Sequence, residues 1–305
     1  MRNAFSSELI GLGKADPSVL LLTGDHGYAL FDDFRRACPD QYINAGIAEQ
    51  NMVGMATGLA RTGFRPVVYG LSAFIPVRVL EQIKLDVAHD ELPVIFIGDG
   101  AGFVYSHLGT SHQSTEDIAC TRAIPNLHVY SPADAYEMSL CMRAAYKARA
   151  AVYLRMGKSD RGEVHKAFPQ ISPGELVCIR AGGNALTLIA TGSMTKTALD
   201  MAEMTYPDAS VWAAPFIKPI DEIQVTRICK NSRIIVTLEE HSVHGGLGSL
   251  VAEIAAENAP VPLLRVGVKD RFSEHCGTYD YLLREHGLDR TAIEQQINTF
   301  LAAWG

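Results

Sequence analysis

The stretch "NAGIAEQNMVGMATGLARTG", residues 44–63, predicts a turn followed by a helix over 49–61. Its apolar side chains recur at helical spacing, and small residues, including Gly54 and Gly58, stand among them. Such residues let another surface approach the helix closely. One carboxylate, Glu49, stands in the first turn of this otherwise apolar segment. An acid at the start of a helix suited to burial marks Glu49 as a candidate functional residue.

Composition limits the classes of function. The chain has 305 residues and is 48% hydrophobic, which is enough for two domains with full cores. Its net charge is −7 without a basic cluster, which argues against nucleic acid and anionic membranes as partners. We expect no signal peptide and no membrane span, because the apolar runs are only strand-sized. Six scattered cysteines without a CxxC pair indicate reduced thiols in a cytoplasmic protein.

Short apolar runs alternate with helical patterns along almost the whole chain, which predicts an α/β fold with parallel sheets covered by helices. We expect two domains, 1–160 and 184–305, joined by a linker at 161–183, because the sequence around 156–175 is polar and rich in Gly and Pro. The predicted strands are 19–23, 66–69, 94–97, 127–130, 151–154, 186–190, 210–213, 233–238 and 261–266. The predicted helices are 49–61, 73–89, 133–149, 193–206, 219–231 and 248–258.

Ligands of open parallel sheets bind beyond the carboxyl ends of the strands. Three loops follow predicted strands there: "TGDHGYA" at 23–29, "GLSAFIPVR" at 70–78, and the glycine-rich "GDGAGFVYSHLGTSHQSTED" at 98–117. The segment "YINAGIAE", which ends at Glu49, approaches in the same way. We therefore expect these distant segments to converge on one face of the first domain.

Five segments, in order, resemble the C-terminal two-thirds of transketolase. They are "GIAEQNMVGMATGLA" (46–60), "LPVIFIGDGAG" (92–102), "GTSHQSTEDIACTRAIPNLHVYSPAD" (109–134), "APFIKPID" (214–221) and "TLEEHSVHGGLGSLVAE" (237–253). The chain is also similar to 1-deoxyxylulose-5-phosphate synthase and to the β subunits of 2-oxoacid dehydrogenases. The resemblance implies a pyrimidine-binding domain for thiamine diphosphate, followed by the transketolase C-terminal domain. It also implies that an α-type partner, in an α2β2 assembly, carries the GDG…N motif that binds Mg2+ and the diphosphate.

The resemblance assigns roles around the cofactor. Glu49 matches the glutamate that hydrogen-bonds N1′ of the aminopyrimidine, and apolar surroundings favour the neutral, proton-sharing form of a carboxyl group. Phe74 matches the aromatic residue that stacks on that ring. Arg78, in the same loop, is a further candidate for cofactor binding. Asp25, in "TGDHG", matches an acid near the cofactor.

The resemblance also implies substrate-binding residues. His112 matches a catalytic histidine of the substrate channel, suited to move a proton near neutral pH. Arg2 and Lys158, with Arg155 nearby, are the candidates to bind a sugar phosphate. Gly100 and Ala29 stand where the family offers a histidine and a serine. Because lysine lacks the bidentate fork of arginine, and two donors are missing, we expect weak phosphate recognition. On this basis Gly100→His should improve the use of phosphorylated acceptors.

The sequence Gly98-Asp99-Gly100, followed by Asn126, imitates the family's magnesium motif. We reject the match, because a three-residue motif is a weak signal and Asn126 leads into a predicted strand. No metal ligand is therefore expected in this chain.

We thus predict the β-type subunit of a split transketolase, which moves a two-carbon ketol unit from a ketose to an aldose. The alternatives are the β subunit of a 2-oxoacid dehydrogenase and a carboligase similar to 1-deoxyxylulose-5-phosphate synthase. A regulatory or scaffold relative is disfavoured because Glu49, Phe74 and His112 are all present.

Overall fold

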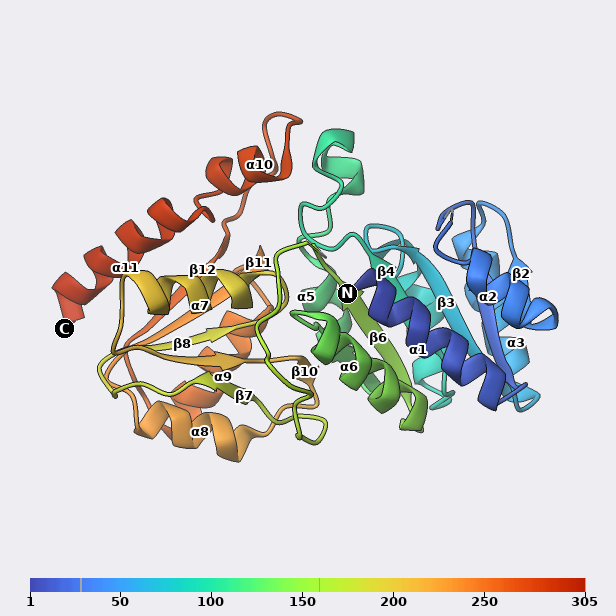
Figure 1. The fold of residues 1–305 in the computed structure, drawn as a ribbon, viewed down its shortest axis with the longest axis horizontal. Coiled ribbons are helices and arrows are strands. Elements are labelled where there is room, and N and C mark those ends of the chain that lie inside the picture. Colours follow the sequence, from blue (N-terminus) through green and yellow to red (C-terminus); the bar gives the residue numbers. More distant parts are fainter. Residues whose placement is uncertain (28, 159, 305) are drawn as a thin grey trace.

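The computed structural model describes residues 1–27, 29–158 and 160–304, which form two α/β halves side by side (Figure 1). The first sheet contains β1 Val19–Thr23, β2 Tyr42–Asn44, β3 Arg65–Leu71, β4 Ile95–Asp99, β5 Leu127–Tyr130, β6 Ala151–Met156 and β10 Phe216–Lys218. The second contains β7 Val177–Arg180, β8 Thr187–Ala190, β9 Ser210–Ala213, β11 Ile235–Ser242 and β12 Leu263–Val268. The helices are α1 Arg2–Ala15, α2 Asp32–Ala37, α3 Glu49–Arg61, α4 Leu80–Gln82, α5 Asp117–Arg122, α6 Ala135–Lys147, α7 Met194–Met204, α8 Glu222–Lys230, α9 Leu247–Asn258, α10 Tyr279–Glu285 and α11 Arg290–Trp304.

The first sheet has the strand order β10-β5-β6-β4-β3-β1-β2, and every pair except β10–β5 is parallel. Helices α1 and α6 pack together on one face, and α3 lies against β3 on the other. Strands covered on both faces read as unbroken apolar runs, as in "VLLLT" of β1, where every residue is buried. The prediction of an α/β fold with parallel sheets is confirmed.

The second sheet has the order β12-β11-β8-β9-β7, in which only β7 is antiparallel. Strand β7 lies inside the segment 161–183 that we expected to be a linker. None of its residues is fully buried, as is usual for an edge strand, and the short apolar run "LVCI" at 176–179 was not recognised because it directly follows a polar stretch rich in Gly and Pro. Strand β10 crosses from the second half of the sequence and adds to β5 of the first sheet.

The helix predicted over 73–89 is divided in the structure. A turn at 71–75 comes first, then a short 3-10 turn Val77–Val79, then α4, then a π-helical turn Ile83–Ala88. Pro76 explains the late start, because proline has no N–H to donate within a helix. The division frees Phe74 from any helix and places it in the loop beyond β3, where it can face a ligand.

A buried polar cluster joins the two halves. Nε of Arg155 lies 2.8 Å from Oδ2 of Asp117, and Nη2 donates to the carbonyl oxygens of Ser114 and Glu240, at 3.3 and 2.7 Å. The side chain of Arg155 is only 3% exposed. Our expectation that Arg155 binds a substrate phosphate is therefore wrong for this chain, because its guanidinium group is buried and already bonded. Arg155 instead holds the loop before α5 against β11.

Two further members of this cluster, Glu239 and His241, have pKa values that are shifted in opposite directions. Burial raises the pKa of Glu239 to about 7 and lowers the pKa of His241 to about 4. Between pH 4.5 and 6.5 the folded chain therefore holds one proton more than the unfolded chain at Glu239 and one fewer at His241. The contributions of these two groups to the pH dependence of stability cancel in this window.

His241→Asn should remove the contribution of His241 to the pH dependence of stability, so that the contribution of Glu239 is no longer cancelled. Proton uptake at Glu239 on folding is then no longer offset, so between pH 4.5 and 6.5 the free energy of unfolding should fall with rising pH more steeply than in the wild type, by up to about 1.4 kcal/mol per pH unit. Urea denaturation across this range measures the slope. The matched control is His275→Asn, at an exposed position, which should keep the wild-type profile. Parallel profiles for His241→Asn and the wild type would contradict the assignment.

Candidate active site

The candidate site lies at the carboxyl edge of the first sheet. Glu49 is the first residue of α3 and is only 6% exposed. Its Oε2 lies 3.2 Å from Nη1 of Arg78, which is itself half-exposed. Within the described chain, Oε1 of Glu49 is buried and has no hydrogen-bond partner. A buried, unpaired carboxyl oxygen is costly, so this atom calls for a donor from outside the chain.

The residues around Glu49 form a chain of contacts between loops that are distant in sequence. The guanidinium carbon of Arg78 lies 3.9 Å from the ring centroid of Phe74, a cation–π contact. The ring of His112 meets Phe74 edge-on, with centroids 5.4 Å apart. The structure thus brings together Glu49, Arg78, Phe74 and His112, which the sequence analysis had placed in one site.

A residue that sequence reasoning missed is His26. Its ring lies 6.4 Å from the ring of Phe74, and its Nε2 is buried without a partner among the described residues. Asp25, the predicted member of that loop, is exposed. The signal for His26 was its position directly after Asp25, in a loop that follows a strand.

The two cations expected to bind a substrate phosphate, Arg2 and Lys158, each lie beside a carboxylate of this chain. Asp99 ends β4, and its Oδ2 accepts from the hydroxyls of Tyr69 and Tyr105, at 2.7 and 2.9 Å. The same oxygen lies 3.4 Å from Nη2 of Arg2. Nζ of Lys158 lies 3.1 Å from a carboxylate oxygen of Asp160. Both candidate cations therefore face a carboxylate of this chain.

Our expectation for Gly100→His is wrong for a steric reason. Gly100 has a φ of 81°, and a Cβ atom there would lie 1.9 Å from the ring of Tyr105. The aromatic ring fills the space in which a histidine would have to stand. Burial and the Asp99 carboxylate raise the pKa of Tyr105, so its hydroxyl stays protonated and donates to Asp99. Tyr105 was not predicted as a site residue.

Asp99 and Asn126 lie at opposite ends of the parallel strands of the first sheet. Asp99 ends β4, whereas Asn126 directly precedes β5, and both strands run parallel to β6. The two residues cannot hold one magnesium ion, in agreement with our rejection of the motif. Among residues 1–27, 29–158 and 160–304, no group of three or more His, Cys, Asp or Glu could hold a metal ion. No helix in the same ranges is long and apolar enough to cross a membrane.

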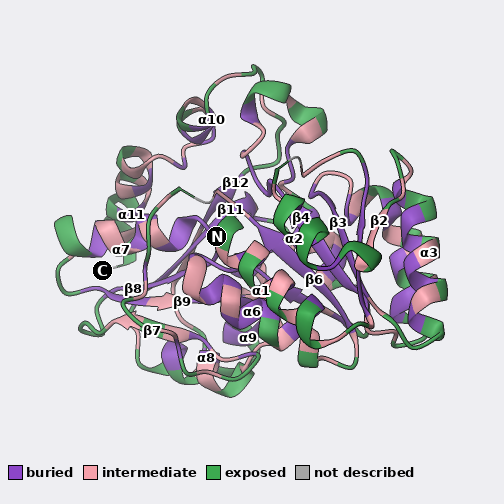
Figure 2. Cartoon of the chain, turned by 45° about the vertical axis from the view of Figure 1, so that its right-hand side comes forward, coloured by how far each residue is buried: buried purple, intermediate pink, exposed green. Residues whose placement is uncertain are grey.

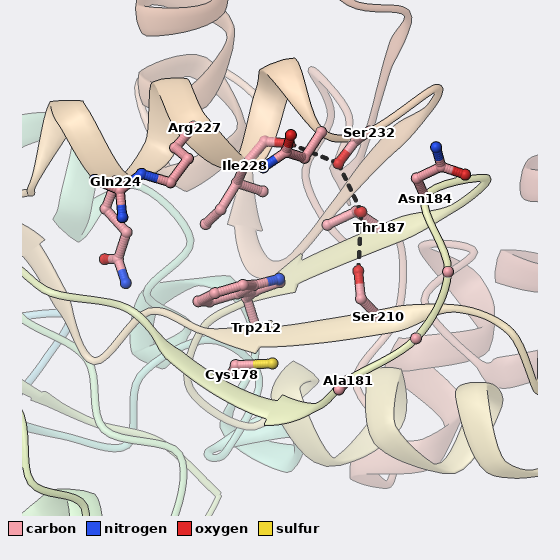
Figure 3. Close-up of a pocket in the computed structure, with 13 residues that line it drawn as sticks. Cys178, Ala181, Asn184, Thr187, Ser210, Trp212, Gln224, Arg227, Ile228 and Ser232 are labelled. Atoms are coloured by element: carbon pink, nitrogen blue, oxygen red, sulfur yellow. Dashed lines mark hydrogen bonds between the residues drawn. The ribbon is translucent and has the colours of Figure 1, made fainter.

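A separate cavity of about 440 Å³ lies in the second domain (Figure 3). Trp212 and Ile228 form its apolar walls, at the end of the sheet where β8 and β9 begin. The hydroxyl of Thr187 is hydrogen-bonded to those of Ser210 and Ser232, at 2.9 and 2.7 Å. These polar groups satisfy one another, and every residue that lines the cavity lies between 178 and 232. The cavity is therefore no part of the site around Glu49.

Comparisons with known proteins agree with this geometry. Residues 1–162 match the family model described as the transketolase pyrimidine binding domain, and residues 174–293 match the transketolase C-terminal domain. A putative transketolase C-terminal section from Methanocaldococcus jannaschii is 37% identical over an alignment of length 307, gaps included, which spans 97% of this chain and 95% of that protein. A 6-deoxy-6-sulfo-D-fructose transketolase subunit from Clostridium sp. (strain MSTE9) is 34% identical and is covered to 92%.

One further relative is longer than this chain, and one solved structure matches it over almost its full length. A 1-deoxy-D-xylulose-5-phosphate synthase from Chlorobium luteolum is 34% identical, but the chain spans only 48% of it. Among solved structures, a split-gene transketolase described as an inactive β4 tetramer superposes with a TM-score of 0.89 at 33% identity, over 100% of this chain and 98% of that one. The chain therefore belongs to the transketolase family and corresponds to its pyrimidine-binding and C-terminal domains.

Proposed function

We propose that this chain is the β-type subunit of a split transketolase that uses thiamine diphosphate to transfer a two-carbon ketol unit from a ketose to an aldose. The observation that carries the proposal is the carboxyl group of Glu49. One of its oxygens is held by Arg78, which also lies over the ring of Phe74, and the other oxygen is buried without a donor in the described chain. A flat heterocycle with a ring N–H would satisfy both the oxygen and the ring.

The residues of this chain fit the aminopyrimidine half of the cofactor. When bound, the cofactor supplies a carbon nucleophile that takes the ketol unit from the ketose and passes it to the aldose. Glu49 would share a proton with the ring nitrogen through Oε1, and Arg78 would keep the carboxyl group in its orientation. Phe74 would offer its ring for stacking. His112, edge-on to Phe74, would exchange a proton with a sugar hydroxyl.

The diphosphate and its Mg2+ would be held by an α-type partner chain, and helix α3 is where that chain would dock. Gly54 and Gly58 are exposed in the middle of this helix, and a Cβ at either would meet nothing within 4 Å in the described chain. Glycine costs a helix about 1 kcal/mol relative to alanine, and these two glycines stand four residues apart on one face of α3, where together they would let a partner surface approach the helix closely. Ile47, which is 74% exposed, adds apolar surface beside Glu49. Figure 2 shows α3 at the outer edge of the first domain.

Reconstitution tests the proposal. Purified alone, the chain should bind thiamine diphosphate weakly and show no ketol transfer, because it supplies only one side of the site. Addition of the α-type chain should restore both tight binding, measured by calorimetry with Mg2+, and turnover. The solved relative described as an inactive β4 tetramer supports this expectation. Tight binding and turnover by the lone chain would contradict the dependence on a partner.

A carboligase of the 1-deoxyxylulose-5-phosphate synthase type is the second candidate, favoured by the 34% identity to such an enzyme over 97% of this chain. The two candidate functions differ in the donor substrate, which is a ketose for a transketolase and pyruvate for the carboligase. The reconstituted enzyme should use a ketose and reject pyruvate. Efficient condensation of pyruvate with glyceraldehyde 3-phosphate would favour the second candidate instead, and acyl transfer from a 2-oxoacid to a lipoyl domain would indicate a dehydrogenase subunit.

Asp99 should affect how well the enzyme uses phosphorylated aldose substrates. Because its carboxylate faces Arg2, we expect poor use of ribose 5-phosphate by the wild type. Asp99→Asn removes the charge but keeps an acceptor for Tyr69 and Tyr105, so KM for phosphorylated aldehydes should fall by about tenfold with kcat unchanged. Steady-state kinetics with matched phosphorylated and neutral aldehydes measures the difference, and neutral aldehydes serve as the control. An equal effect on both classes would show that Arg2 does not meet the phosphate.

A further inference from the structure

His112 lies in a loop that leaves the first domain and returns to it at an adjacent point, and this loop, residues 103–113, is called the excursion below. Gly102 and Ser114 form an isolated antiparallel bridge, with hydrogen bonds of 2.8 and 3.0 Å, and residues 103–113 project beyond it. In Figures 1 and 2 this excursion stands beside α10 of the second domain. Its exposed tip contains His107 and Leu108. A loop of this kind needs contacts at its base to hold a side chain in one place.

The second domain supplies the first contact at the base. Oε1 of Glu240, at the end of β11, accepts the backbone N–H of Phe103 at 2.6 Å. Gly102 makes this approach possible, since a Cβ there would lie 2.3 Å from the Glu240 carboxylate. The other oxygen of Glu240 accepts from Ser193 and Tyr279. The start of the excursion is therefore fixed to a carboxylate that is itself fully bonded.

A second contact holds the end of the excursion, directly beside His112. Nε2 of His286 lies 2.9 Å from Oγ of Ser273, and that hydroxyl donates to Oε1 of Gln113 at 2.7 Å. Because Ser273 donates its proton to Gln113, its oxygen must accept from His286. The neutral Nε2–H tautomer is thereby selected, which leaves Nδ1 as a lone pair without a partner in the described chain. The His286 ring stacks on Phe103, with centroids 4.7 Å apart and an interplanar angle of 22°.

The protonation state of His286 agrees with a hydrogen bond donated from its Nε2 to Ser273. Burial and the neighbouring charge of Arg271 lower the pKa of His286. Its side chain is 1% exposed. A neutral imidazole is the form that donates from Nε2 alone, so the hydrogen bonds run in one sense from His286 through Ser273 to Gln113.

We propose that Ser273 and His286 are positioning residues of the active site, through which the C-terminal domain holds His112 against Phe74. The hydrogen bonds fix Gln113, the ring stack fixes Phe103, and His112 stands between these two anchored ends of the excursion. The inference rests on the proposed function for the role of His112, but the anchoring itself does not. It gives the second domain, which contributes no other residue to the site described above, a part in the reaction.

Hydrogen exchange on the isolated chain tests the anchoring without any need for activity. Ser273→Ala should raise the exchange rate within residues 103–113 by about fivefold, the equivalent of one lost hydrogen bond. His286→Phe, which keeps an aromatic ring over Phe103 but removes the donor, should do the same. Ser232→Ala is the matched control, because Ser232 is a half-buried serine of the same domain with two hydrogen bonds. Unchanged exchange in both test variants would overturn the proposal, whatever the activity.

Kinetics of the reconstituted enzyme then test the link to His112. Ser273→Ala should lower kcat by about tenfold and change KM for the ketose less than about twofold, while Ser273→Thr, which keeps the hydroxyl, should restore most of the rate. In a His112→Ala background, Ser273→Ala should have no further effect on kcat, because it acts through that side chain. Additive losses, or a wild-type kcat for Ser273→Ala, would overturn the positioning role. An inactive wild-type enzyme with accelerated exchange in the variants would refute the proposed function and leave the anchoring intact.

Discussion

Glu49→Gln is expected to lower the turnover of the reconstituted enzyme by several orders of magnitude. The amide keeps the shape of the carboxyl group and can still bond Arg78, but it cannot share a carboxylic proton at the buried Oε1 position. Because activation of the cofactor precedes every turnover, its loss appears in kcat. Cofactor affinity should stay within about tenfold of the wild type, since one hydrogen bond can still form.

Two measurements separate these effects. Calorimetry with thiamine diphosphate and Mg2+ gives the affinity of the assembled enzyme, and single-turnover kinetics gives the rate. Glu81→Gln, at an exposed position of α4 three residues after Arg78, is the control and should leave both values unchanged. If Glu49→Gln kept more than about a tenth of the wild-type rate, the assigned role would be wrong.

Gly54→Leu combined with Gly58→Leu is expected to abolish assembly with the α-type chain. Both positions are open in the described chain, so leucine fits there without strain and should stabilise the isolated subunit, because it favours the helix more than glycine does. The same side chains would prevent a partner surface from approaching α3. We expect the affinity for the partner to fall by at least about 100-fold, which corresponds to about 2.7 kcal/mol.

Helix α1 offers a matched control. Gly11 is also exposed within a helix, and a Cβ there also meets nothing within 4 Å in the described chain. Gly11→Leu should therefore stabilise the isolated chain in the same way and leave assembly intact. Analytical ultracentrifugation with the partner, together with urea denaturation of each variant alone, measures both quantities. Normal assembly of the Gly54 and Gly58 variant would remove α3 from the proposed interface.

The sequence predicted the parts of the fold that depend on local periodicity. Buried parallel strands such as β1 and β5 are mostly apolar, with a single polar residue, His128, inside β5, and both were predicted with the bounds that the structure shows. Helix α3 was also predicted over its full length. Strands β7 and β10 were missed because they are short and antiparallel, and their pairing depends on partners that are distant in sequence.

The site was predicted unevenly for a related reason. Glu49, Phe74 and His112 could be named because they stand in segments that resemble the family, and Arg78 because it shares a loop with Phe74. Arg155 was misread because nothing local shows that its guanidinium group faces Asp117 in the interior. The roles of Tyr105 and of the Ser273–His286 pair depend on contacts between distant segments, and no spacing in the sequence reveals them.

The crossing of β10 into the first sheet has a consequence for biosynthesis. During translation the first 160 residues leave the ribosome well before Phe216–Lys218, so the outer edge of β5 stays unpaired until the chain is more than two-thirds complete. An unpaired strand edge invites association with another nascent chain. A gene fragment that encodes the first domain alone would keep that edge open permanently and should yield an aggregation-prone product. Only fragments that retain residues 216–218 would close it.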